Sequence, residues 1–237
     1  MTQHVLHRRL IAGDMTIVLE PVDDVTLIIE DQAHVASLAA TVKVVVTRPQ
    51  QVVHVVVLSL AAGSRTIHLE MMVTGEGAQA FLAVVTVAHA TNHKTIVTKM
   101  QNNGRHTHGY IEQRGLVMAR SHVDFKSVGQ IFAGAVGADA QQTSRLLMLD
   151  ETATGSVDPI LLIDENDVLA GHAASVGQVN QTQLLYLLSR GIAMNLAQQL
   201  VTRGFMAPAL VSLSTTMQQK VFTELEEAMS GETSASR

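Results

Sequence analysis

The 237-residue sequence contains no cysteine and no tryptophan, and aromatic residues make up only 3% of it. Without thiols, the chain forms no disulfide bonds, has no cysteine nucleophile and offers no thiolate ligands. The few aromatic rings leave little for nucleic-acid bases to stack on. The net charge is −5 and the basic residues are scattered, which also argues against nucleic-acid binding.

Segments typical of membrane insertion, secretion and nucleotide binding are missing as well. The most apolar run, Val52 to Leu60, is too short to span a bilayer and contains His54. Residues 1–10 have no apolar stretch of signal-peptide length, so we expect a cytoplasmic protein without membrane association. The nearest match to a Walker A loop, residues 129–137, has no lysine after Gly134, which argues against ATP hydrolysis by this chain alone.

Apolar residues make up 47% of the chain, enough for a buried core. From Met15 to about Val176 the pattern indicates β-strands: residues 67–73 alternate between apolar and polar, and several runs are dense in valine. We expect no crossover helix before Gln178. Many short strands are typical of a sandwich, a barrel or a β-helix, and without a fixed-period repeat all three remain open.

The pattern changes to helical spacing after Gln178. Asn180 is a predicted N-cap and Gly191 a predicted helix end, and a second apolar stripe ends near Gly204. A third helix is expected to start near Thr215. Three short helices do not form a core of their own, so they must pack on the β region or on a partner. We therefore divide the chain into a β core (1–178), a helical region (179–230) and a mobile tail (231–237).

Four histidines form a candidate metal constellation. His89 and His93 are four residues apart, and His106 and His108 share a face if they lie on a strand. Such spacings can ligate zinc or iron, and the corresponding hypothesis is a β-helical metal-binding enzyme. The alternative is that these are exposed histidines in a chain that contains 11 of them.

The segment from Gln141 to Phe205 carries the most specific pattern. Asp-Pro-Ile-Leu-Leu-Ile-Asp-Glu-Asn at 158–166 is followed by Asp-Val-Leu-Ala-Gly-His-Ala-Ala-Ser-Val-Gly at 167–177. Leu-Leu-Tyr-Leu-Leu-Ser-Arg-Gly-Ile follows at 184–192, and Arg-Gly-Phe at 203–205. In this order and spacing, the segment resembles the C-terminal core of the SufB/SufD family, and residues 167–177 resemble its SufD branch.

The resemblance implies a mainly β fold: a right-handed parallel β-helix followed by a small C-terminal helical region. It also implies a non-enzymatic scaffold subunit of the SUF iron–sulfur cluster assembly complex. Such a subunit pairs with a SufB-like subunit and docks a SufC-type ABC ATPase through its helices. No cofactor is expected to bind tightly, although a transient cluster is expected at the SufB interface. A homodimer is expected for the isolated chain, and a homo-oligomeric structural protein remains an alternative.

The resemblance also assigns candidate residues. His172 matches the family histidine that lies at the SufB–SufD interface and is implicated in cluster assembly. The residues that match the helical signature are predicted to bind the partner: Tyr186, Arg190, Gly191, Gly204 and Phe205. Three features depart from the family pattern. Ala170 stands where some members have cysteine, Leu185 replaces an aromatic residue, and the chain has little room for the N-terminal helical region of many members.

Overall fold

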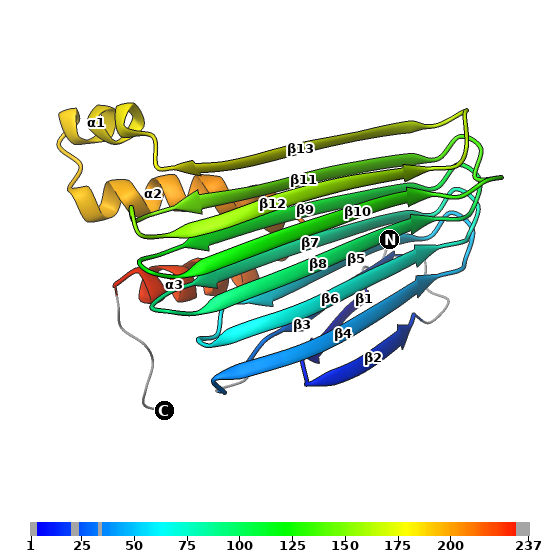
Figure 1. Cartoon of the computed structure of the whole chain (residues 1–237), viewed down its shortest axis with the longest axis horizontal. Coiled ribbons are helices and arrows are strands. Elements are labelled where there is room, and N and C mark those ends of the chain that lie inside the picture. The colour runs from blue at the N-terminus through cyan, green and yellow to red at the C-terminus, as the bar shows by residue number, and fades with distance from the viewer. Residues whose placement is uncertain (1–3, 20–23, 33–34, 231–237) are drawn as a thin grey trace.

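The computed structural model describes residues 4–19, 24–32 and 35–230, so the tail expected at 231–237 lies outside the described residues. Within them, the strands wind into a parallel β-helix of two facing sheets (Figure 1). The fold predicted from the family resemblance is therefore confirmed, and the sandwich and the barrel are excluded. No helix in the described ranges is long and apolar enough to cross a membrane.

Successive strands alternate between the two sheets, and all pairs are parallel and in register. Within the described residues, the odd-numbered strands form a seven-stranded sheet, called the odd sheet: β1 (His4–Arg9), β3 (Asp24–Glu30), β5 (Val52–Ser59), β7 (Gln79–Ala88), β9 (His108–Val117), β11 (Asp139–Met148) and β13 (Leu169–Gln178). The others form the six-stranded even sheet: β2 (Gly13–Val18), β4 (Ser37–Val46), β6 (Ser64–Val73), β8 (His93–Asn102), β10 (His122–Ile131) and β12 (Thr154–Ile163).

The main core lies between the two sheets. In β6 the residues Ile67, Leu69, Met71 and Val73 are buried, and His68 and Glu70 between them face outward, as the alternation predicts. Each fully buried aliphatic side chain contributes about 1.5–3 kcal/mol relative to exposure. The even sheet thus has one covered face and one face open to solvent.

The odd sheet is covered on its outer face too. Val56, Val85, Leu116 and Leu147 point outward from this sheet and join a second apolar cluster with the C-terminal helices. Both faces of β5 are therefore largely buried, which explains why its sequence is a nearly continuous run of valines. In the described part of the chain, the helices that follow β13 are α1 (Gln181–Ser189), α2 (Met194–Met206), the 3₁₀-helix η1 (Ala207–Leu210) and α3 (Thr215–Ser230).

The helix boundaries confirm most of the sequence signals and correct one. The Asn180 side chain accepts hydrogen bonds from the backbone N–H groups of Thr182 and Gln183, so it caps α1 as predicted. Gly191 follows α1 with φ +80°, a conformation that favours glycine at a helix end. Gly204, however, lies inside α2, which continues to Met206. The stripe expected to end near Gly204 therefore extends to Met206, because the helix keeps its buried face up to that residue.

Three charged side chains are buried where the chain turns between the sheets. Arg65 and Asp31 form a fully buried ion pair, with Nε and Oδ2 2.5 Å apart. Nearby, the Nζ of Lys94 donates to the carbonyl oxygens of Ser59 at 2.7 Å and Ala61 at 2.9 Å. Burial lowers the pKa of Lys94 to about 7; the Asp31 charge opposes the shift and the Arg65 charge adds to it. The Arg65 and Lys94 side chains thus donate to backbone carbonyl oxygens at this turn, whereas the Asp31 carboxylate accepts from Arg65.

Candidate functional site at the last turn of the β-helix

The last turn of the β-helix, formed by β12 and β13, is uncovered. Each of these strands has a single strand neighbour in the described part of the chain, β10 for β12 and β11 for β13. No residue of either strand is buried, whereas the adjacent strands β10 and β11 bury every second residue. Leu169 is 67% exposed, and Leu162, Ile163 and Val176 are exposed as well. Figure 1 shows β13 along the upper edge, with nothing stacked beyond it.

His172 lies in the middle of β13, rather than at the strand-to-helix junction, and its register partner on β11 is Gln142. Gln142 is buried, and its Nε2 donates to the Ile160 carbonyl on β12 at 2.8 Å, so it points toward the interior between the sheets. Register partners in a parallel sheet point to the same face. His172 therefore faces the interior side of an uncovered turn and is exposed there.

The interior next to this turn is polar. The Ser144 hydroxyl on β11 donates to Gln113 Oε1 on β9 at 2.6 Å and lies 3.4 Å from the Ser127 hydroxyl on β10. Among the described residues, neither Gln113 Nε2 nor Gln142 Oε1 has a hydrogen-bond partner, although both atoms are buried. These residues were not predicted from the sequence, because β11 is polar on both faces over this stretch and shows no alternation.

A second exposed surface covers α1 and the first half of α2. Tyr186 is 58% exposed, and the Arg190 guanidinium lies 5.2 Å from the centre of its ring. Gly191 is exposed at the end of the same helix. Figure 1 shows α1 beyond the end of β13, clear of both sheets. The exposed apolar residues of this surface, called the α1–α2 surface, are Leu185, Tyr186, Met194, Leu196 and Leu200.

The remaining two predicted partner residues lie in different environments. Gly204 is exposed on α2. Phe205 is half-buried against the odd sheet, where the Arg114 guanidinium of β9 stacks over its ring at 5.2 Å. Arg114 also donates to the Phe205 carbonyl at 3.1 Å and pairs with Glu112. Phe205 thus helps to attach the helices to the β-helix.

The structure does not bring the four candidate metal histidines together. His89 and His93 lie where β7 ends and β8 begins, but His106 and His108 lie at the other end of β8. A ten-residue strand is about 30 Å long, so the two pairs cannot share an ion.

His93 instead contacts Asp124, which also contacts His122. Asp124 and His122 were not predicted from the sequence, because the winding of the chain, not sequence spacing, brings them to His93. Partial burial tends to raise the pKa of the Asp124 carboxyl, but hydrogen bonds from Ser156, His122 and His93 together lower it.

Comparisons with known proteins identify the family. A family model described as SUF system FeS cluster assembly, SufBD core domain, matches residues 8–205. The chain belongs to the SufB/SufD family. The match runs from β1 through nearly all of α2, so it includes the uncovered turn and the α1–α2 surface.

Individual relatives agree with this assignment. The chain is similar to the iron–sulfur cluster assembly protein SufD of Bacillus subtilis, with 43% identity over 139 residues, or 59% of this chain. It is 28% identical to SufD of Escherichia coli over 131 residues and 26% identical to SufB of B. subtilis over 134 residues, 53% and 56% of this chain. The matched segments span 32%, 31% and 29% of those three proteins, respectively.

Proposed function

We propose that this SufB/SufD family member is a SufD-type scaffold subunit of an iron–sulfur cluster assembly complex, without catalytic activity of its own. The observation that carries the proposal is the uncovered last turn of the β-helix, with His172 on its interior side. Its proposed partners are a SufB-like subunit at this turn and an ABC-type ATPase on the α1–α2 surface.

The unpaired strand edges and the exposed side chains of the last turn make it suited to pairing with a partner. An edge strand presents unpaired backbone N–H and C=O groups that a partner strand can bind. The interior-facing side chains of β13, such as Ala174 and Val176, lack the packing that their register partners Ser144 and Leu146 have. A second β-helix end placed on this turn would bury these side chains and extend the core. The family resemblance, which implies pairing with a SufB-like subunit, makes that subunit the favoured occupant.

His172 is the proposed point of contact with the nascent cluster. A neutral imidazole can ligate iron and can move protons near neutral pH. The chain has no cysteine, so thiolate ligands for a cluster must come from the partner. The cluster is therefore the transient cargo of the interface and not a resident cofactor of this chain.

The ATPase is proposed to dock on the α1–α2 surface. This surface exposes several large apolar side chains, and a patch of that kind typically marks a protein interaction site. The chain has no Walker A lysine, so a complex that uses ATP needs a separate ATPase subunit. Tyr186 and Arg190 are the proposed contacts. Phe205 acts indirectly, by fixing α2 to the odd sheet.

The test is co-purification with the SufB-like and ATPase subunits from the same source, followed by iron and sulfide assay of the complex. Wild type and His172→Ala are expected to assemble equally, and His172→Ala is expected to hold about tenfold less cluster or lower. His108→Ala, which removes an exposed histidine at the far end of the strands, is the matched control and should retain the cluster.

Tyr186→Ala tests the second surface in the same experiment. The variant is expected to lose ATPase capture, because Tyr186 is exposed on the α1–α2 surface. It is expected to keep the SufB-like subunit, because α1 lies beyond the end of β13. If wild type captures neither subunit, the proposed function is wrong. If His172→Ala holds as much cluster as wild type, the role of His172 is wrong and the scaffold role remains.

A further inference from the structure

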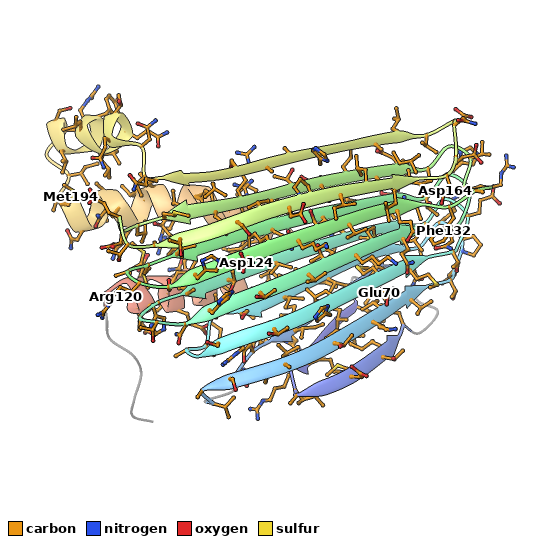
Figure 2. The ribbon with its side chains drawn as sticks, viewed as in Figure 1. Glu70, Arg120, Asp124, Phe132, Asp164 and Met194 are labelled. Carbon is orange, nitrogen blue, oxygen red and sulfur yellow. The ribbon has the colours of Figure 1, made fainter. Side chains whose placement is uncertain are left out.

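A compact group of metal-ligating side chains lies on the outer face of the even sheet, in strands β8 and β10. His93 and His122 are register partners at the first positions of these strands, and Asp124 follows on the same face of β10. His93 Nε2 lies 2.9 Å from Asp124 Oδ2, and His122 Nε2 lies 2.8 Å from Asp124 Oδ1. Figure 2 shows Asp124 on the viewer's side of this sheet, toward the end where the helices lie.

Neighbouring side chains on β12 hold two of these groups in place. The Thr154 hydroxyl lies 2.7 Å from His122 Nδ1, the ring nitrogen that faces away from Asp124. The Ser156 hydroxyl donates to Asp124 Oδ1 at 2.6 Å. Hydrogen bonds of this kind to the outer side of a ligand fix its orientation and raise metal affinity. The three groups are thus oriented by the strand register and by two further side chains.

The arrangement fits a single ion. The three candidate ligand atoms lie within 4.8 Å of one another. A tetrahedral ion with bonds of about 2.0–2.2 Å separates its ligand atoms by roughly 3.3 Å. The two distances between the imidazole nitrogens and the Asp124 oxygens therefore need to increase only slightly when an ion binds. The His93 side chain is 54% exposed, which leaves the remaining coordination positions to water or to an external ligand.

We propose that His93, His122 and Asp124 form a binding site for one divalent first-row transition-metal ion on the outer face of the even sheet. Two imidazoles and one carboxylate suit zinc, cobalt and ferrous iron better than calcium or magnesium, which prefer oxygen ligands alone. The site lies on the solvent side of the sheet, opposite to the interior side that His172 faces. The inference does not depend on the proposed scaffold function.

The test is a titration of the tag-free, metal-free chain with Co²⁺, whose visible absorption reports bound ion and coordination number. Wild type is expected to bind one equivalent, which Zn²⁺ displaces. His93→Ala and His122→Ala are each expected to weaken Co²⁺ binding at least about tenfold, and Thr154→Val to weaken it less while leaving all three ligands in place. Thermal unfolding of each variant shows that it remains folded.

His108→Ala is the matched control. His108 is also the first residue of its strand, and its Nδ1 lies 3.8 Å from Asp139, but within the part of the chain that the structure describes no second imidazole completes that pair. The control is expected to bind Co²⁺ as wild type does. The proposal is wrong if wild type binds no stoichiometric Co²⁺, or if removing His93 lowers the affinity no more than removing His108.

Discussion

Lys94 shows how one buried residue couples the fold to pH. Its ammonium group lies inside the β-helix and donates to carbonyl oxygens of residues 59 and 61. Burial lowers its pKa from 10.5 to about 7, so near neutral pH the group is poised between its charged and neutral forms. A lysine in this place costs stability when charged, because desolvation of the ammonium is only partly offset by Asp31.

The stability of the chain should therefore rise with pH above neutrality. Between pH 7 and 10.5 the unfolded chain holds a proton on Lys94 that the folded chain has lost, so folding is favoured as pH rises. From pH 7 to 9 this contributes about 2 kcal/mol to the free energy of unfolding. Denaturant unfolding gives the free energy of unfolding of wild type and Lys94→Met at pH 7 and at pH 9. The increase between the two pH values should be larger in wild type than in Lys94→Met by about 2 kcal/mol.

Lys126, which is exposed on the outer face of β10, provides the control for that measurement. Lys126→Met should keep the pH dependence of wild type, since the side chain is not desolvated by folding. A Lys94→Met variant with the same pH dependence as wild type would contradict the assigned cause.

The roles of individual histidines could not be read from their spacing in the sequence. Position 172 was selected through the family resemblance; it lies on the uncovered strand β13, and its role stays a prediction. The spacing of His89, His93, His106 and His108 suggested one metal site, but the chain places these residues at both ends of β8. His93 and His122 become neighbours only through strand register, and that register is invisible without the fold.

At the scale of elements, strands were predictable where one face meets solvent. β6 alternates cleanly because its outer face is exposed, whereas β5 is buried on both faces and reads as a continuous valine run. The β-helix itself was not readable from periodicity, because the number of residues per turn is not constant along the chain. The family resemblance, carried by residues 141–205, selected the fold instead.

Two glycines of the helical region that look alike in sequence are expected to respond in opposite directions. Gly191→Ala should destabilise the chain by about 1–2 kcal/mol, because Gly191 ends α1 at φ +80° and alanine is strained there. Gly204→Ala should stabilise it by up to about 1 kcal/mol, because Gly204 lies inside α2 with open space around the added Cβ. Denaturant unfolding followed by circular dichroism measures both.

Each glycine variant serves as the control for the other, since both make the same chemical change in neighbouring helices. Destabilisation by Gly204→Ala would show that α2 ends earlier than Met206 in solution. A neutral Gly191→Ala would show that the end of α1 is frayed, so that no positive φ has to be maintained.

At the scale of the whole molecule, the outer faces of the odd and even sheets differ in what covers them. Helices cover the part of the odd sheet's outer face that carries Val56, Val85, Leu116 and Leu147, and the outer face of the even sheet carries polar side chains, as a solvent-facing sheet should. At the last turn, apolar and interior-facing side chains lie exposed together. A stacked structure of this kind needs a cap, and here a second protein chain is the proposed cap.

The isolated chain should therefore dimerise through its last turn when a SufB-like partner is absent. Ala174→Lys should raise the dimer dissociation constant at least about tenfold, because the lysine charge would be buried in the interface. Ala39→Lys is the matched control: Ala39 is exposed on β4, which has a strand on either side, so dimerisation should be unchanged.

Sedimentation over a range of concentrations distinguishes these cases. A dimer that is weakened by Ala174→Lys alone locates self-association at the last turn, where the unpaired edges of β12 and β13 lie. Equal dimerisation of both variants and wild type would exclude this turn as the contact. Such a dimer is compatible with the scaffold role. The same edge can pair with a second copy or with a SufB-like chain, so these two partners compete for it.

Adding the SufB-like subunit should accordingly convert the homodimer into a heterodimer. A homodimer that resists this exchange would favour a homo-oligomeric structural protein instead.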